Sequence, residues 1–126
     1  MPQLTEYQNI IDSKPIHIAT VTANGDPNLS VASDVQVLDN KHLLISVNEM
    51  NRTQENIKTN PKVVIMAFDK DWKGVRIFGT ADFYVSGEYY DMCKQKFFAN
   101  GEVTPFGATE PKGAIVVEAT EISEYV

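Results

Sequence analysis

The sequence contains few of the residues from which catalytic and metal sites are commonly built. Its 126 residues include one cysteine, Cys93, and two histidines, His17 and His42. A single cysteine excludes an internal disulfide, and the spacing of these three residues does not resemble that of a zinc site. We therefore predict no catalytic residue and no metal ligand. The cysteine content is typical of the reducing cytoplasm, where we expect the protein to be located.

Phosphate-binding and nucleophile motifs are also absent. The chain has no GxGxxG pattern and no GxxxxGK[ST] loop, so the common nucleotide-binding folds find no support. It also has no GxSxG pattern, in which a hydrolytic serine is placed on a sharp turn. Any chemistry is therefore expected to come from a cofactor.

Basic residues are fewer than acidic ones. The 11 Lys and Arg against 17 Asp and Glu give a formal net charge of −6. This charge repels phosphate backbones and anionic membranes, so neither nucleic acid nor a membrane is an expected partner. The longest apolar runs, such as residues 63–68, are far shorter than the roughly 20 residues that cross a bilayer. The first six residues lack the pattern of a signal peptide. We expect a soluble protein.

The composition is that of one folded domain. Hydrophobic residues make up 43% and charged residues 22% of the chain, as in ordinary globular proteins. A length of 126 residues leaves no room for a second domain. Residues 1–126 are therefore predicted to form a single domain.

Hydrophobic periodicity predicts three helices and six strands. The helices are expected from Leu4 to a stop at Lys14–Pro15, from Asn51 to about Asn60, and from residue 86 or 87 to residue 99, with residues 100–101 as the terminator. The strands are expected at residues 16–22, 29–38, 42–47, 62–68, 74–85 and 114–119. The first three strands are predicted to form an antiparallel meander, and residues 101–112 a loop. The predicted fold is mainly β with α: a six-stranded antiparallel split β-barrel with peripheral helices.

The start of the second helix has the composition of an anion site. Asn51 is predicted to cap this helix, with Gln54 three residues later completing a capping box. A helix N-terminus offers free N–H groups and the positive end of the helix dipole, to which Arg52 and Thr53 add a charge and a hydroxyl. These residues alone favour a plain helix start, with Arg52 in solvent, over a phosphate site.

The order of the elements and four short motifs resemble the FMN-binding split-barrel family. This family includes pyridoxamine 5′-phosphate oxidases and small FMN-binding proteins. The motifs are IHIATVTANGDP at 16–27, VQVLD at 35–39, MNRTQENI at 50–57 and NPKV at 60–63, and the resemblance extends from about Ile10 to Ala119. It implies an FMN at the interface of a homodimer, with the phosphate held by Asn51, Arg52 and Thr53.

The resemblance also implies which residues lie along the rest of the cofactor. The flavin ring and the ribityl chain are expected along the second and third strands, where backbone groups face the ring, at Ser30, Val31, Ala32, Ser33, Ser46, Val47 and Asn48. The partner chain is expected to complete the pocket. The candidates for that role are Trp72, Phe106 and the loop at 101–112.

Two departures from the family pattern change the expected activity. The larger oxidases carry an Arg and a Lys on the second strand, whereas residues 30–34 here offer hydroxyls and one carboxylate. Those oxidases also continue into a C-terminal substrate-phosphate motif, whereas this sequence stops at Val126. We therefore expect weaker FMN binding and an activity other than vitamin B6 oxidation. A flavin-dependent reductase or an electron carrier, acting on a small molecule or a redox partner, is the leading interpretation.

Three alternatives remain open from the sequence. The split barrel could bind haem, with His17 as a ligand; it could be a deazaflavin-dependent reductase; or it could be a non-catalytic dimeric binding domain.

Overall fold

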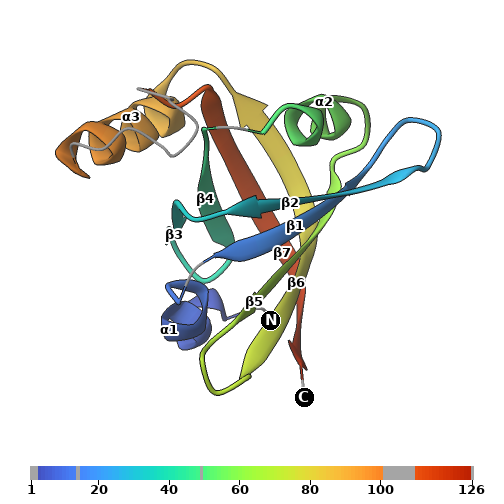
Figure 1. Cartoon of the computed structure of the whole chain (residues 1–126), viewed down its shortest axis with the longest axis vertical. Coiled ribbons are helices and arrows are strands. Elements are labelled where there is room, and N and C mark those ends of the chain that lie inside the picture. The colour runs from blue at the N-terminus through green and yellow to red at the C-terminus, as the bar shows by residue number, and fades with distance from the viewer. Residues whose placement is uncertain (1–2, 14, 49, 101–109, 126) are drawn as a thin grey trace.

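Seven β-strands form one antiparallel sheet that curls around a hydrophobic core (Figure 1). The computed structural model describes residues 3–13, 15–48, 50–100 and 110–125. In chain order the strands are β1 (Ile16–Val21), β2 (Pro27–Ala32), β3 (Val35–Val37), β4 (His42–Val47), β5 (Lys62–Phe68), β6 (Gly74–Tyr84) and β7 (Gly113–Tyr125). Their order across the sheet is β2-β1-β5-β6-β7-β4-β3. The predicted mainly β split barrel is confirmed, with seven strands rather than six in the described part of the chain.

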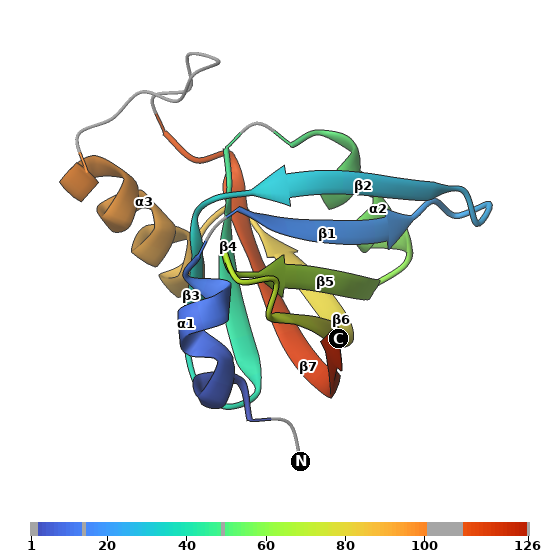
Figure 2. The same cartoon turned by 60° about the horizontal axis from the view of Figure 1, so that its bottom comes forward.

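The two edge strands, β2 and β3, follow each other in the sequence. Only Ser33 and Asp34 separate them, so the sheet curls until β2 approaches β4 (Figure 2). The backbone N–H of Ser46 donates to the carbonyl oxygen of Asp34 at 2.9 Å and fixes this corner. The predictions of one strand over 29–38 and of a three-strand meander are therefore wrong. β1 and β2 form the predicted hairpin, but β3 pairs with β4 at the other edge.

Alternating side chains give the sheet an inner and an outer face. Ile16 and Ile18 of β1 are fully buried, whereas His17 and Ala19 are half-buried. β5 and β6 alternate in the same way. The inner side chains form the core of the barrel, and the outer face stays partly open to solvent.

Three helical segments surround the sheet. A 3₁₀ turn, η1 (Leu4–Tyr7), runs into the short α1 (Gln8–Ile11), and together they bury Leu4 and Ile11. α2 (Arg52–Thr59) packs against β1, β2 and β6, while α3 (Glu88–Asn100) packs outside β4 and β7 (Figure 1). The predicted helices are confirmed. Gly101, one of the two predicted terminator residues of the third helix, lies outside the described residues. None of the helices in the described ranges is long and apolar enough to cross a membrane.

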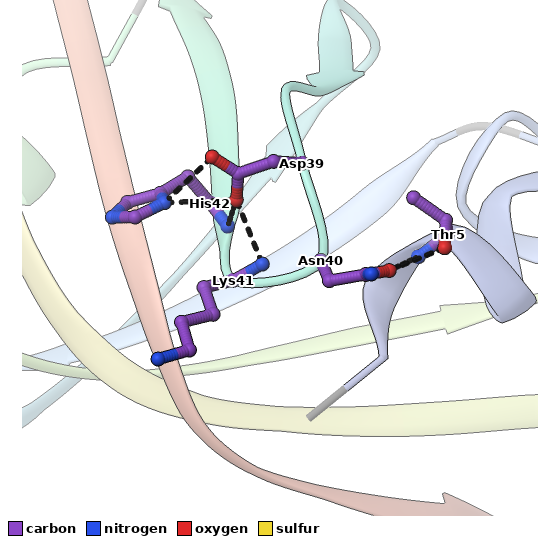
Figure 3. Close-up of polar contacts among 5 residues, drawn as sticks. All are labelled: Thr5, Asp39, Asn40, Lys41 and His42. Carbon is purple, nitrogen blue, oxygen red and sulfur yellow. Dashed lines mark hydrogen bonds and ion pairs between the residues drawn. The ribbon is translucent and has the colours of Figure 1, made fainter. Parts of the chain in front are cut away.

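The β3–β4 turn ties the N-terminal segment to the barrel (Figure 3). Asp39 Oδ1 accepts the backbone N–H groups of Lys41 and His42 at 2.8 and 2.9 Å, and His42 Nδ1 lies 2.9 Å from the same oxygen. The Lys41 N–H and the His42 side chain, in that order, lower the pKa of Asp39. Asn40 in turn accepts the Leu4 N–H at its carbonyl and bonds Thr5 through its side chain. This end of the barrel lies away from α2.

The last strand is longer than predicted. β7 pairs with β6 as far as Tyr125, whereas the sequence pattern predicted an end at residue 119. Glu118, Glu121 and Glu124 are exposed and recur every third residue, so the sequence does not show the two-residue alternation that predicts a strand. A register shift opposite Phe78 and Gly79 accommodates this spacing.

Candidate functional site

Three polar side chains join the edge strand β2 to the start of α2. Ser30 Oγ and Thr53 Oγ1 are hydrogen-bonded at 2.6 Å, and Asn28 Nδ2 donates to Thr53 Oγ1 at 3.4 Å and to Ser30 Oγ at 3.5 Å. Thr53 is fully buried, and Ser30 is half-buried. Two of the predicted cofactor residues are therefore in contact. Asn28 was missed, although its position two residues before Ser30 places both side chains on one face of a strand.

A second polar contact fixes α2 relative to β1. Asn56 Nδ2 donates to Thr20 Oγ1 at 3.0 Å, and both side chains are buried. Thr20 is the cross-strand partner of Asn28 on β2. The first turns of α2 are thus held against two adjacent strands, by a buried hydrogen bond to β1 and partly buried ones to β2.

The first turn of α2 does not contain the predicted capping box. Asn51 is the N-cap residue, but its side chain makes no capping bond. Its Oδ1 instead accepts a hydrogen bond from Lys112 Nζ at 2.9 Å. The buried Oε1 of Gln54 has no hydrogen-bond partner among the described residues. The capping prediction is wrong because Lys112, which is remote in sequence, competes for the Asn51 oxygen.

Two cationic side chains lie at this end of α2. Arg52 is the first helical residue and is exposed. Lys112 is exposed as well, and its backbone N–H donates to the carbonyl oxygen of Val47 at 2.6 Å. The N-terminus of a helix is the positive end of its dipole, where anions are favoured and cations are not. This arrangement is chemically suited to bind an anion. Lys112 is the last residue of the loop at 101–112 that was expected to complete a partner's pocket. Its position at the start of α2 in its own chain was not predicted, because a lone lysine after a proline carries no motif.

The predicted ring contacts on β2 point in different directions. Val31 lies on the outer face and is 55% exposed, whereas Ala32 is buried. Ser33 is exposed at the corner between β2 and β3. Of the β2 candidates, Ser30 is the residue whose side chain contacts α2.

The predicted contacts on β4 lie mostly inside the protein. Val47 is fully buried in the core, and Ser46 is 4% exposed. The Ser46 hydroxyl donates to Asn48 Oδ1 at 3.0 Å. The Val47 carbonyl, through its bond to Lys112, is the part of this segment that connects to the α2 start.

Trp72 lies far from α2 within one chain. It follows β5, whereas α2 ends just before β5 begins, so the length of that strand, about 23 Å, separates them. Its backbone φ is 64°, in the left-handed region, and its ring stacks on Phe68 at 5.3 Å between centroids. Trp72 is 69% exposed and is available to a second copy of the chain. Phe106 lies outside the described residues.

The architecture and these motifs match a known family over almost the whole chain. The family model described as Pyridoxamine 5′-phosphate oxidase matches residues 4–125. The chain belongs to this family.

Proteins similar to this chain include a heme oxygenase and an FMN-binding protein. Heme oxygenase HutZ of Vibrio cholerae is 32% identical over 77 residues, which cover 61% of this chain and 42% of HutZ. The crystal structure of HupZ from Group A Streptococcus is 27% identical with a TM-score of 0.82 and covers 95% of this chain and 91% of that one. An FMN-binding protein of Syntrophomonas wolfei is 20% identical with a TM-score of 0.75, covers 94% of this chain and 80% of that one, and is similar in fold alone.

One face of the sheet in this oxidase-family chain is apolar and partly exposed. We call it the outer face. Its apolar part is formed by cross-strand neighbours on β1, β2, β5 and β6: His17, Ala19, Val21, Leu29, Val31, Val64, Met66, Phe68 and Phe78. Arg76, opposite Met66, and Lys62 lie on the same face. A groove of about 570 Å³ lies over part of it, lined by residues that include Val21, Val64 and Phe78. Exposed apolar surface of this kind is typical of an interaction site.

The histidines and the cysteine lie away from the start of α2. His17 is on the outer face, with its ring nearly parallel to Phe68 at 6.1 Å, and His42 is paired with Asp39. Cys93 lies on α3 and is buried against β4 and β7, and this burial raises the pKa of its thiol to about 11. Among the residues that the structure describes, no group of three potential ligands is placed to hold a metal ion.

Proposed function

We propose that this chain is an FMN-binding protein that holds the cofactor phosphate at the start of α2 and acts as a flavin-dependent reductase or electron carrier. The observation that carries the proposal is an exposed Arg52 on the first turn of a helix whose N-cap side chain, Asn51, does not cap. Backbone N–H groups and the helix dipole favour a phosphate at such a position. The guanidinium adds a charge-assisted, bidentate contact.

The groups beside Arg52 fit the rest of a flavin nucleotide. Asn28 and Ser30 are half-buried polar residues on β2 and are suited to the phosphate or to the ribityl hydroxyls. The buried Thr53 holds Ser30 in place rather than binding the ligand itself. Since β2 is an edge strand, the backbone groups on its free side are available to the ring.

Bound FMN would supply the redox chemistry through its ring. The role assigned to this chain is to bind and orient the cofactor: Arg52 anchors the phosphate, and β2 supports the ring. His42 is engaged with Asp39 at the β3–β4 turn, away from α2, and is given no part in the reaction.

We further propose that the working unit is a homodimer formed through the outer face. Leu29 and Val31 are exposed on the same side of the sheet as the groove, so a two-fold copy would present the same surface back to it. Covering these side chains removes apolar surface from water. Such a pairing would also bring Trp72 of one chain towards the other, as the predicted partner role requires.

Haem is the second candidate, and the sequence comparisons favour it over flavin. HutZ is a haem oxygenase by name and is 32% identical over the matched 77 residues. His17, half-buried on the outer face, is the candidate iron ligand. The start of α2 favours FMN instead. Its free helix end and the exposed Arg52 are suited to a phosphate, and neither of them is an iron ligand.

The absorbance spectrum of the freshly purified protein separates these candidates. Flavin bands, with FMN recovered in the supernatant after unfolding, support the main proposal. A Soret band that is lost in His17→Ala supports haem, and release of a deazaflavin identifies a deazaflavin reductase. A colourless protein that takes up neither added FMN nor added haem contradicts both candidates and leaves a dimeric binding domain.

A further inference from the structure

We infer that the ion pair between Asp34 and Lys96 uses α3 to position the two segments along which the flavin ring is expected, residues 30–33 and 46–48. We call these two stretches the ring segments. The inference rests on the proposed function and adds a part of the molecule that the proposed function does not use. Asp34 and Lys96 are positioning residues, since they act through the backbone of β2 and β4 and are assigned no contact with the cofactor.

Asp34 connects three elements of the fold. Its backbone directly follows the first ring segment, and its carbonyl oxygen accepts the N–H of Ser46 on β4 at 2.9 Å. Its carboxylate oxygen Oδ1 lies 3.0 Å from Nζ of Lys96 on α3. The backbone bond joins the end of one ring segment to the start of the other, so the position of Asp34 sets the spacing of the two segments at this corner.

The ion pair is largely enclosed by protein. The Asp34 side chain is 15% exposed, and that of Lys96 is 34% exposed. Both line a cavity of about 10 Å³, which has room for about one water molecule. The other lining residues are Gln36, Leu44, Ser46 and Cys93. A pair with so little water around it is screened less than a surface pair, and loss of one partner leaves the other charge unpaired in a partly buried place.

The ion pair supplements a small apolar contact between α3 and the sheet. α3 packs outside β4 and β7, apart from the main core of the barrel (Figure 2). Its contact with the sheet includes a separate buried cluster: Leu44, Cys93, Ala114 and Val116. Because this cluster is much smaller than the main core, a charge pair at its edge contributes substantially to how firmly α3 is docked.

Loss of the pair should loosen the corner and so the spacing of the ring segments. A ligand that lies along two segments is bound more weakly when binding must first order them. The ring is common to FMN and riboflavin, so both flavins should lose affinity by the same factor. Loss of Arg52 should affect FMN alone, because Arg52 is assigned to the phosphate. The ratio of the two affinities therefore separates ring positioning from phosphate binding.

The test compares Lys96→Met and Asp34→Asn with the wild type, with and without flavin. Fluorescence titration gives the affinities for FMN and for riboflavin. In the flavin-free protein, hydrogen exchange of the Ser46 amide reports on the corner. Labelling of Cys93 by a thiol reagent reports on the docking of α3, because Cys93 is the single cysteine and is buried against the sheet. Lys96→Arg keeps the charge, and Lys41→Met is the charge-matched control, since Lys41 is exposed in the β3–β4 turn.

We expect Lys96→Met and Asp34→Asn to weaken the binding of FMN and of riboflavin equally, by about fivefold, the upper range for a partly exposed ion pair. Both variants should also speed exchange at Ser46 and labelling of Cys93. The double variant should bind no more weakly than the single variants, because both remove the same interaction. Lys96→Arg and Lys41→Met should behave as the wild type.

The outcomes separate this inference from the proposed function. If the wild type binds no flavin but both variants loosen the corner, the proposed function falls and the coupling of α3 to the corner stands. If the wild type binds FMN, and the variants bind both flavins as tightly or lose affinity for FMN alone, the inference is overturned and the proposed function stands. Unchanged exchange at Ser46 in both variants also overturns the inference.

Discussion

The hydroxyl oxygens of Ser30 and Thr53 lie 2.6 Å apart, and this hydrogen bond fastens the edge strand β2 to the first turn of α2. Thr53 is fully buried. Since Arg52 directly precedes Thr53, the position of its backbone relative to β2 depends on this bond. The same contact therefore joins the stability of the fold to the geometry of the proposed phosphate site.

Thr53→Val tests whether the hydrogen bond between Ser30 and Thr53 stabilises the fold. Valine retains the size of threonine but removes the hydroxyl that bonds both Ser30 and Asn28, which leaves those two side chains with only the 3.5 Å bond between them. We expect the free energy of unfolding to fall by about 1 to 3 kcal/mol, as measured by urea denaturation. Ser30→Ala and the double variant complete a double-mutant cycle. If the two single effects simply add, the hydroxyls do not interact.

Arg52→Ala tests whether Arg52 binds the phosphate of FMN. Loss of a charge-assisted hydrogen bond is worth roughly 1.5 to 3 kcal/mol, so FMN affinity should fall about tenfold to a hundredfold. Riboflavin affinity should not change, because Arg52 is assigned to the phosphate. Fluorescence titration of both ligands measures this, and Arg52→Lys, which keeps a point charge, should lie in between. Unchanged FMN affinity in Arg52→Ala would place the phosphate elsewhere.

Leu29→Lys tests the dimer. Leu29 is 68% exposed on the outer face, so a charge there should leave the fold intact and oppose burial of that face. We expect a shift towards monomer in analytical ultracentrifugation. The matched control is Val85→Lys, since Val85 is similarly exposed at 64% but follows the end of β6 and is not part of the outer face. A wild-type monomer, or an unaffected Leu29→Lys dimer, rejects this interface.

The Cys93 thiol gives a prediction about pH. Burial is the main cause that raises its pKa from 9.0 to about 11. Below pH 9.0 the thiol is protonated in both folded and unfolded chains. Between about 9 and 11 the unfolded chain releases the proton and the folded chain keeps it, so the free energy of unfolding falls as the pH rises.

Urea denaturation over this pH range, with Cys93→Ala as the comparison, isolates the contribution of the thiol from those of the other titrating groups. The free energy of unfolding of Cys93→Ala should fall less than that of the wild type over this pH range. In addition, a thiol reagent should label the native wild type far more slowly than the unfolded chain at neutral pH. Identical pH profiles of variant and wild type, or rapid native labelling, contradict the assignment.

The local pattern of apolar and turn residues was sufficient to predict most of the helices and strands. The strands at 42–47 and 62–68 were predicted with the ends that the structure has, because their apolar runs are bounded by clear turn residues. The start of α2 was likewise predicted within one residue. The sequence did not predict that the chain passes from β2 to the opposite edge of the sheet. Ser33 and Asp34 have the pattern of a continuous strand, and the barrel closure that bends them is a tertiary effect.

The residues that meet at the start of α2 were predicted only in part, for the same reason. Arg52 and Thr53 belong to a short motif at a helix start, which sequence reasoning can recognise. Asn28 and Lys112 reach the same point from other parts of the chain, and only the folded sheet brings them there. The side chains of Val47 and Ser46 are buried, because both faces of β4 are covered, one by the core and one by α3. The backbone contacts expected between these residues and the ring stay a prediction.

The central claim is that the start of α2 binds the phosphate of FMN. The most direct measurement is a fluorescence titration of the purified, cofactor-free protein with FMN and with riboflavin under identical conditions. The account predicts saturable binding of FMN in the micromolar range or tighter, and binding of riboflavin at least tenfold weaker. No saturable binding at micromolar FMN, or equal affinity for the two flavins, would contradict it.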